Sequence, residues 1–332
     1  MSMKSTLTAL LLTTAVASPA FAENAKVVFG TNWLAQAEHG GFYQSVADGT
    51  YAACGLDVEI ISGGPQVNNR ALMLAGRIDY HMGGDLLQAF NAVKEGIPVV
   101  AVAATFQKHP QVLVAHPDVE SWEGLKDRTL LIGDNGFTSY YQWMIAEHGF
   151  TVEQRQPYTF NPAPFLADTN VAMQGYLSSE PYVVEKEGGF EPNVFLIADN
   201  GFSSYATTIE TMQATIDEKP EQVKCFVEGS IKGWYNYLYG DNAAANELIK
   251  TANPDMTDDK IAYAIGKMKE WGIVDSGDAL EMGIGVMTDE IVNDFYAKMV
   301  NAGVIEEGLD VSAAYTLEFV GEGVGMDLKP GG

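Results

Sequence analysis

The sequence predicts an α/β protein of two lobes with a ligand cleft between them. Its 332 residues are more than one average domain needs. Short strand-like runs alternate with helical segments after residue 22, and a second such set follows before the chain becomes mostly helical. This order predicts that residues 23–115 form the first part of the first lobe, that residues 116–205 form the second lobe, and that residues 206–332 return to the first lobe as helices.

The first 22 residues have the pattern of a signal peptide. Lys4 is followed by an apolar stretch at 7–16, and "SPAFA" provides a small-residue cleavage site that ends at Ala22. The apolar stretch is too short for a bilayer span, and no later segment is long and apolar enough. The chain is therefore expected to be exported and soluble after cleavage.

The strands and helices of the first lobe follow from the hydrophobic pattern. Residues 98–106 form a continuous apolar run, which is typical of a strand buried on both faces. Strands are expected at 25–30, 56–62, 78–84 and 98–106, and helices at 41–51, 63–76 and 85–96.

The second lobe repeats the alternation before the chain changes character. Strands are expected at 128–133, 170–177 and 193–201, and from about Thr208 onward mostly helices, at 211–240, 246–252, 259–271 and 289–303. Crossings near Ala115 and Tyr205 would form a double hinge. A cleft beyond the carboxyl ends of the strands is the expected place for a small ligand.

The charge of the chain narrows the range of partners. A formal net charge of −25 disfavours nucleic acids and anionic membrane surfaces. The arginines are Arg70, Arg77, Arg128 and Arg155, and none falls at the end of a predicted strand. An anion site built from arginine forks is therefore not favoured.

The two cysteines, Cys54 and Cys225, allow two interpretations. They could pair in an oxidising compartment. Their apolar, helix-like surroundings favour two buried free thiols instead. No Cys/His spacing indicates a metal site, and no cofactor is expected.

Candidate binding residues lie mostly at the carboxyl ends of the predicted strands. They combine aromatic rings, amides, a carboxylate and glycines, which suits a flat, nitrogen-rich heterocycle stacked on a ring and hydrogen-bonded at its edge. The candidates are Asn32, Trp33, His39, Gln66, Gly84, Asp85, Phe106, Asn135, Tyr140, Tyr176 and Glu180.

These residues are expected to play different parts. Trp33 provides one stacking face, Asn32 and His39 bond the ring edge, and Tyr176 with Glu180 acts from the opposite lobe. Each also has a structural alternative. In particular, Trp33 could fill the core between the first strand and helix, Asn135 could cap a helix, and Phe106 could line the hinge.

Several segments resemble the thiamine-precursor-binding family. They are Asn32-Trp33 with "EHGGFYQSVADGTYAACGLDVEI", the stretch from 72 to 114, the trio Gly175, Tyr176 and Glu180, and "EMGIGVMTDEIVNDFYAKMVNAGVI". The family consists of type II periplasmic solute-binding proteins of ABC importers, and it is similar to fungal hydroxymethylpyrimidine synthases. The resemblance implies a two-lobed fold, a periplasmic location, a monomer, an ABC permease partner and a pyrimidine thiamine precursor as ligand.

Other functions remain possible on the same fold. Riboflavin is one alternative ligand, because aromatic walls do not report ring size, and a sulfonate- or nitrate-type anion is another. An enzyme of pyrimidine synthesis is an alternative of a different class. The sequence lacks the cofactor lysine and the cysteine cluster of the fungal synthases, and no nucleophile–base pair stands out. We therefore expect a binding protein and not an enzyme.

Overall fold

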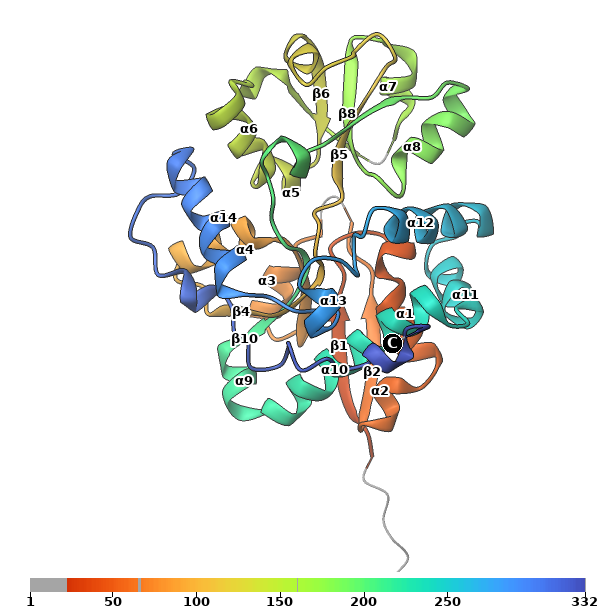
Figure 1. The fold of residues 1–332 in the computed structure, drawn as a ribbon, viewed down its shortest axis with the longest axis vertical. Helices are drawn as coiled ribbons and strands as arrows, with labels where there is room; N and C mark the ends of the chain where they lie inside the picture. Colours follow the sequence, from red (N-terminus) through yellow and green to blue (C-terminus); the bar gives the residue numbers. More distant parts are fainter. Residues whose placement is uncertain (1–22, 65–66, 160, 332) are drawn as a thin grey trace, which may run out of the picture.

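The computed structural model describes residues 23–64, 67–159 and 161–331, and it has two lobes, each built on one sheet (Figure 1). The predicted signal peptide and Gln66 lie outside the described residues. Of the helices in the described ranges, none combines the length and hydrophobicity that a bilayer span requires.

The first sheet contains the four strands predicted for the first lobe and one that was not predicted. Its order is β2-β1-β3-β10-β4, with β1 parallel to β2 and β3, and β10 antiparallel to β3 and β4. The strands are β1 (Ala25–Gly30), β2 (Leu56–Ile61), β3 (Tyr80–Asp85), β4 (Val99–Phe106) and β10 (Ala206–Met212). The expectation of helices from Thr208 is wrong for β10, which returns the chain to the first lobe between β3 and β4.

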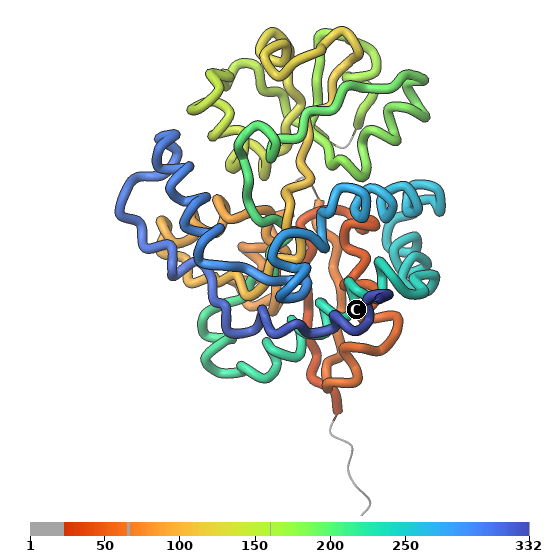
Figure 2. Tube along the Cα trace, viewed as in Figure 1, coloured from red at the N-terminus to blue at the C-terminus, as the bar shows by residue number. Residues whose placement is uncertain are grey.

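The second sheet has the order β7-β6-β8-β5-β9. Its strands are β5 (Gln111–Ala115), β6 (Thr129–Ile132), β7 (Arg155–Pro157), β8 (Val171–Tyr176) and β9 (Asn193–Leu196). Because β5 pairs antiparallel with β8 and β9, the first crossing between the sheets lies at 107–110 and not near Ala115. Figure 2 shows this segment and the returning segment at 197–205 running between the lobes.

Helices cover both sheets, and most of them belong to the first lobe (Figure 1). The helix expected at 41–51 is two helices, because Gly49 adopts a positive φ of 77° between them. The helices are α1 (Gly40–Ala47), α2 (Thr50–Ala53), α3 (Asn69–Leu74), α4 (Leu86–Lys94), α5 (Asp134–Phe137), α6 (Tyr140–His148), α7 (Ala163–Ala167), α8 (Glu180–Val183), α9 (Gln213–Glu218), α10 (Pro220–Tyr239), α11 (Ala243–Ala252), α12 (Asp258–Glu270), α13 (Ala279–Met282) and α14 (Asp289–Asn301).

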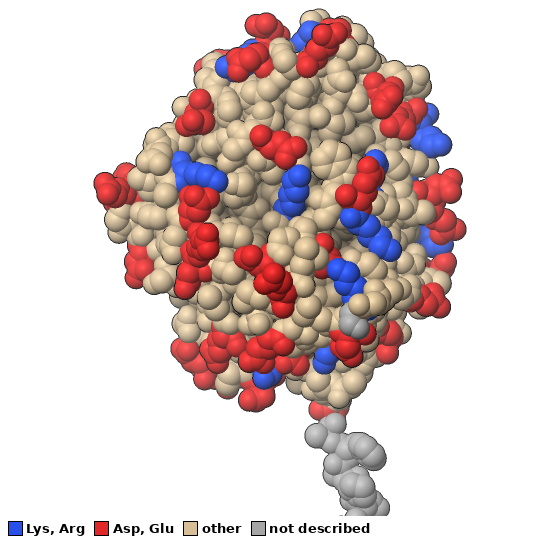
Figure 3. Space-filling view, viewed as in Figure 1, with Lys and Arg blue, Asp and Glu red and all other residues tan. Residues whose placement is uncertain are grey.

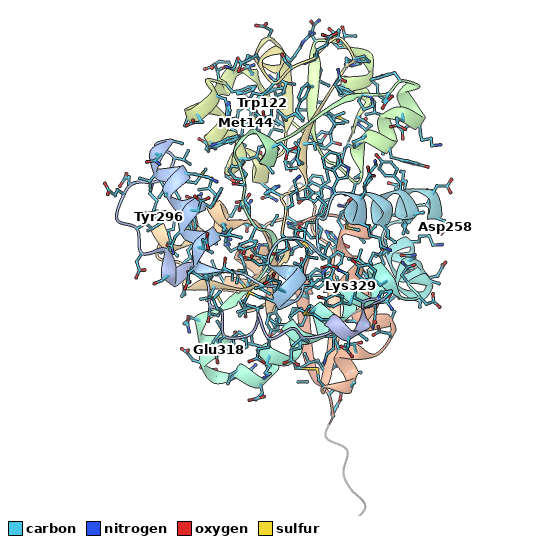
Figure 4. The ribbon with its side chains drawn as sticks, viewed as in Figure 1. Trp122, Met144, Asp258, Tyr296, Glu318 and Lys329 are labelled. Carbon is cyan, nitrogen blue, oxygen red and sulfur yellow. A yellow bond between two sulfur atoms is a disulfide. The ribbon has the colours of Figure 1, made fainter. Side chains whose placement is uncertain are left out.

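Aromatic side chains fill the cores of both lobes. In the first lobe Phe226 of α10 stacks on Tyr80, with ring centroids 4.2 Å apart. Trp234 of α10 lies directly over Gly41 of α1, where a Cβ atom would collide with its indole ring. In the second lobe the partly buried Trp122 packs against a cluster that contains Met144 of α6 and that extends to Phe90 and Phe295 of the first lobe (Figure 4). These packed cores make each lobe a rigid support for the residues at its edge.

A disulfide joins Cys54, at the end of α2, to Cys225 in α10, with the Cα atoms 5.9 Å apart. The expectation of two buried free thiols is therefore wrong. Cys54 is exposed and not buried, and α1, α2 and α10 pack together, which brings two residues separated by 171 positions within bonding distance. Such a bond fits a protein that folds in an oxidising compartment.

Replacing both cysteines, as C54S with C225S, should lower the free energy of unfolding by about 2–5 kcal/mol, because the bond closes a long loop in the unfolded chain. Urea denaturation of wild type and variant, each with and without dithiothreitol, measures this. The reductant should lower the midpoint of the wild type alone. Equal midpoints for oxidised wild type and variant would contradict a stabilising bond.

Candidate functional site

A cavity of about 70 Å³ lies between the lobes, beyond the ends of β1, β3 and β8. Eight of the predicted residues line it: Asn32, Trp33, Gly84, Asp85, Asn135, Tyr140, Tyr176 and Glu180. The first four come from the first lobe and the last four from the second. The rule that ligands lie beyond the carboxyl ends of strands therefore located most of the cavity wall.

Two predicted residues do not reach this cavity. His39 is buried in the first lobe with 2% of its surface exposed, and burial lowers the pKa of its imidazole to about 3, so it is neutral there. Phe106 is fully buried, and its ring centroid lies 5.6 Å from that of Trp234. Both are core residues, because β4 and the start of α1 face the aromatic side chains of α10.

Five polar lining residues were not predicted: Gln36, Gln88, His109, Gln111 and Gln174. Gln111 and Gln174 lie on the paired strands β5 and β8. Because β5 was not recognised as a strand, nothing in the sequence placed them together. The position of Gln88 could have been predicted. It follows Asp85 by three residues at the start of a helix, where the side chain at the N-cap bonds the third helical residue and so brings the two residues together.

Trp33 is positioned by a tight turn after β1. The backbone oxygen of Trp33 accepts hydrogen bonds from the Thr31 hydroxyl at 2.8 Å and from the Gly63 amide at 3.1 Å. A Cβ atom at Gly63 would overlap the backbone of Thr31, so only glycine fits at this approach. The partly buried indole of Trp33 then packs against the core cluster of the second lobe and does not plug the first.

The Asp85 carboxylate bonds groups from both lobes. One oxygen accepts the Gln88 amide at 3.1 Å and so caps α4. The other accepts the Ser139 hydroxyl from the second lobe, and His109 Nε2 lies 3.7 Å from it. Because His109 Nδ1 accepts the Gln111 amide, the ring proton lies on Nε2, which faces Asp85.

Glu180 is the second carboxylate of the cavity wall. Its Oε2 accepts the Tyr176 amide at 2.7 Å, which holds the side chain across the end of β8. Burial raises the pKa of Glu180 from 4.5 to about 7, and the negative charge of nearby Glu38 adds to the rise. A positive or hydrogen-donating ligand group beside this carboxylate would stabilise its charged form.

The remaining polar groups complete the wall of the second lobe. The Tyr140 hydroxyl donates to Gln174 Oε1 at 3.2 Å, and the Gly133 amide donates to the same oxygen at 2.6 Å. Burial raises the pKa of Tyr140 well above 10, so its hydroxyl stays protonated and keeps this bond at neutral pH. Both bonds use Gln174 Oε1, so the amide nitrogen of Gln174 is a hydrogen-bond donor at the cavity wall.

The charged side chains of the cavity wall favour neutral or cationic ligands over anions. None of its described lining residues is Lys or Arg, and Arg70 instead pairs with buried Glu210 at 2.8 Å. Acidic side chains also dominate the face shown in Figure 3. Within the described ranges, no group of three or more His, Cys, Asp or Glu residues could hold a metal ion. The arrangement suits a neutral or cationic ring.

Comparison with known proteins places the fold. A family model described as "NMT1/THI5 like" matches residues 36–245. Riboflavin-binding protein RibY of Chloroflexus aurantiacus is 24% identical over 321 residues, covering 89% of this chain and 86% of that protein.

Two solved structures are similar in fold. One is the Candida albicans CA3427 gene product, described as having the generic periplasmic binding protein fold (TM-score 0.62, 17% identity, 89% of this chain and 96% of the other). The second is the alkanesulfonate-binding protein SsuA of Xanthomonas axonopodis pv. citri bound to MOPS (TM-score 0.63, 11% identity, 89% and 99%). The predicted two-lobed α/β class is thus confirmed.

The variant E180Q tests the protonation of Glu180 without ligand. An acid whose pKa is higher in the folded state binds more protons folded than unfolded, so its contribution to stability falls as pH rises from 4.5 to about 7. The stability of E180Q relative to wild type should therefore rise over this interval and level off above it.

Thermal melting of both proteins across the interval measures this difference. The comparison between them is needed because buried His39 and His81, with pKa values lowered to about 3 and 4, act in the opposite direction in both proteins. A difference between the two proteins that is constant with pH would show that Glu180 titrates as an ordinary carboxyl.

Proposed function

Because the chain belongs to the NMT1/THI5-like family, we propose that it is the substrate-binding protein of an ABC importer and captures a small aminopyrimidine of the thiamine-precursor type. The proposal includes export to the periplasm after cleavage near Ala22, action as a monomer, and delivery of the ligand to a membrane permease. The main support for this proposal is the position of Glu180. Its carboxylate is held beside aromatic and amide side chains, and none of the described residues that line the cavity is Lys or Arg.

The chemistry of an aminopyrimidine matches these groups. An exocyclic amine and a protonated ring nitrogen are adjacent donors, which a carboxylate such as Glu180 can accept together. The faces of the ring can pack on Trp33 or Tyr176, one from each lobe. The amides of Asn32 and Asn135 line the cavity from opposite lobes and can bond the remaining ring edge.

The size of the cavity supports a single ring. The cavity is small, about 70 Å³, which favours a single substituted ring over a larger ligand. The fused three-ring system of riboflavin is larger, so the lobes would have to separate further to admit it.

Riboflavin is nevertheless the second candidate ligand. The relative named as a riboflavin-binding protein covers 89% of this chain, and the aromatic residues Trp33, Tyr140 and Tyr176 would also suit a flavin ring. A sulfonate or nitrate is less suited, because the described wall provides carboxylates and no cationic fork.

The site is arranged for binding more than for nucleophilic catalysis. Ser139, Asp85 and His109 lie together, but the Ser139 hydroxyl donates to the carboxylate and not to the imidazole. His109 Nδ1 is already occupied by the Gln111 amide. A serine nucleophile needs a base that can take its proton, and the Ser139 hydroxyl is instead bonded to the Asp85 carboxylate.

Lobe closure is the proposed mechanism of capture. The cavity has walls from both lobes, so a bound ring contacts both only when they are close together. These added contacts favour the closed state over the open one. Cross-lobe bonds such as Ser139 to Asp85, and Gln88 Nε2 to the Asn135 backbone oxygen at 3.5 Å, already stabilise that arrangement without ligand.

A thermal-shift screen tests the ligand class. Hydroxymethyl and formylamino aminopyrimidines should raise the melting temperature with increasing concentration, because a ligand that binds only the folded state stabilises it by mass action. Riboflavin, taurine, an alkanesulfonate and nitrate complete the panel. A shift with riboflavin alone would select the second candidate, and a shift with the anions alone would refute the proposed site.

The variant E180Q tests the residue that carries the proposal. Glutamine keeps an oxygen for the Tyr176 amide but loses the charge, so aminopyrimidine affinity should fall by about 10-fold or more, as for a lost charge-assisted hydrogen bond. Calorimetric titration measures it, with E191Q as the matched control, since Glu191 is exposed in the same lobe. Equal losses in both variants would exclude a direct role for Glu180.

A further inference from the structure

A second cavity of about 380 Å³ adjoins the first, and three residues, Trp33, Gln36 and Glu180, line both. It also lies between the lobes, with α8 on one side and the start of α12 on the other (Figure 1). Asp258, labelled in Figure 4, is the first residue of α12. The two cavities are therefore neighbours that share one wall.

A buried carboxylate with an unused oxygen lines this second cavity. Only 1% of the surface of Glu38 is exposed. Its Oε1 accepts the Ser178 hydroxyl from the second lobe, whereas Oε2 has no hydrogen-bond partner among the described residues. Burial raises the pKa of Glu38, as expected for a charge that lacks a positive partner. A buried acceptor of this kind is costly unless something donates to it.

The other polar groups of the second cavity have the same preference. Glu187 and Asp255 add two more carboxylates, against one cation, Lys260, which donates to the Asp255 backbone oxygen at 3.1 Å. The ring of Tyr182 also lines the cavity and lies 5.1 Å from that of Tyr263 across the lobes. Carboxylates together with an aromatic ring attract a cation or a group with several hydrogen donors.

We propose that this second cavity receives a cationic, hydroxyl-bearing group attached to the ring that occupies the first cavity, so that the site takes a ligand of two joined parts. The inference rests on the proposed function, because it assumes a small ring in the first cavity. The connection between the two parts passes the shared wall at Trp33 and Glu180. Glu38 Oε2 accepts a hydrogen bond from the second part.

Two probes with the same ring separate the cavities. The probe 4-amino-5-hydroxymethyl-2-methylpyrimidine has the ring alone, and thiamine joins that ring to a cationic second ring with a hydroxyethyl arm. Calorimetric titration of the full chain with each probe measures both parts of the site. Wild type should bind both, with thiamine at least as tight.

The variant V183F blocks the second cavity, since Val183 lines it and does not line the first. It should lower thiamine affinity at least 10-fold and change the affinity of the single-ring probe less than 3-fold. V152F makes the same substitution at an exposed valine in the same lobe and should change neither. Unchanged thiamine affinity in V183F, or equal losses for both probes, would overturn the inference.

The variant E38Q provides an independent test that does not depend on how V183F packs. Glutamine keeps an oxygen for the Ser178 hydroxyl and replaces the unused oxygen with a donor. Thiamine affinity should fall about 10-fold relative to single-ring affinity in the same variant. This ratio removes any change that the loss of the Glu38 charge causes at Glu180. If wild type binds the single-ring probe but not thiamine, the second cavity is refuted and the proposed function stands. If wild type binds neither, both are refuted.

Discussion

The carboxylate of Asp85 is the interaction on which the arrangement of the lobes depends. It caps α4 in the first lobe, accepts the Ser139 hydroxyl from the second, and faces His109 in the crossing segment between them. With 2% of its surface exposed, its charge is compensated by these groups and by the positive end of a helix. One side chain at the cavity wall thus links the start of α4, the contact with Ser139 of the second lobe, and His109 of the crossing segment. A ligand that displaces any one of these groups would also disturb the other two through Asp85.

The interior of the interface continues the acidic character of the surface. Glu38, Asp85 and Glu180 all lie between the lobes, and the described lining of the first cavity has no cation. A ligand with positive charge or several donors would relieve the mutual repulsion of these groups, and an anion would increase it. The residues that hold the lobes together are thus better suited to a neutral or cationic ligand than to an anion, and on this ground we propose the pyrimidine-type ligand.

Most strands and most of the first cavity could be predicted from the sequence, because the strands are apolar runs and parallel strands bring their carboxyl ends to one edge. The antiparallel strands were missed for physical reasons. β10 contains Thr208 and Glu210, polar residues that are buried only because hydroxyl bonds and Arg70 satisfy them. Missing β5 concealed Gln111 beside β8. The disulfide was missed because two cysteines 171 residues apart meet only through packing of α2 on α10.

The paired crossings limit how the lobes can move. β4 and β10 are neighbours in the first sheet, and β5 and β9 are neighbours in the second. The segments 107–110 and 197–205 are therefore held next to each other at both ends. Two adjacent tethers bend together easily about an axis that crosses both, but they resist rotation of one lobe about the line that joins the lobes. The opening angle between the lobes is therefore the direction in which these two segments resist bending least, and a change in that angle keeps the two cavity walls facing each other.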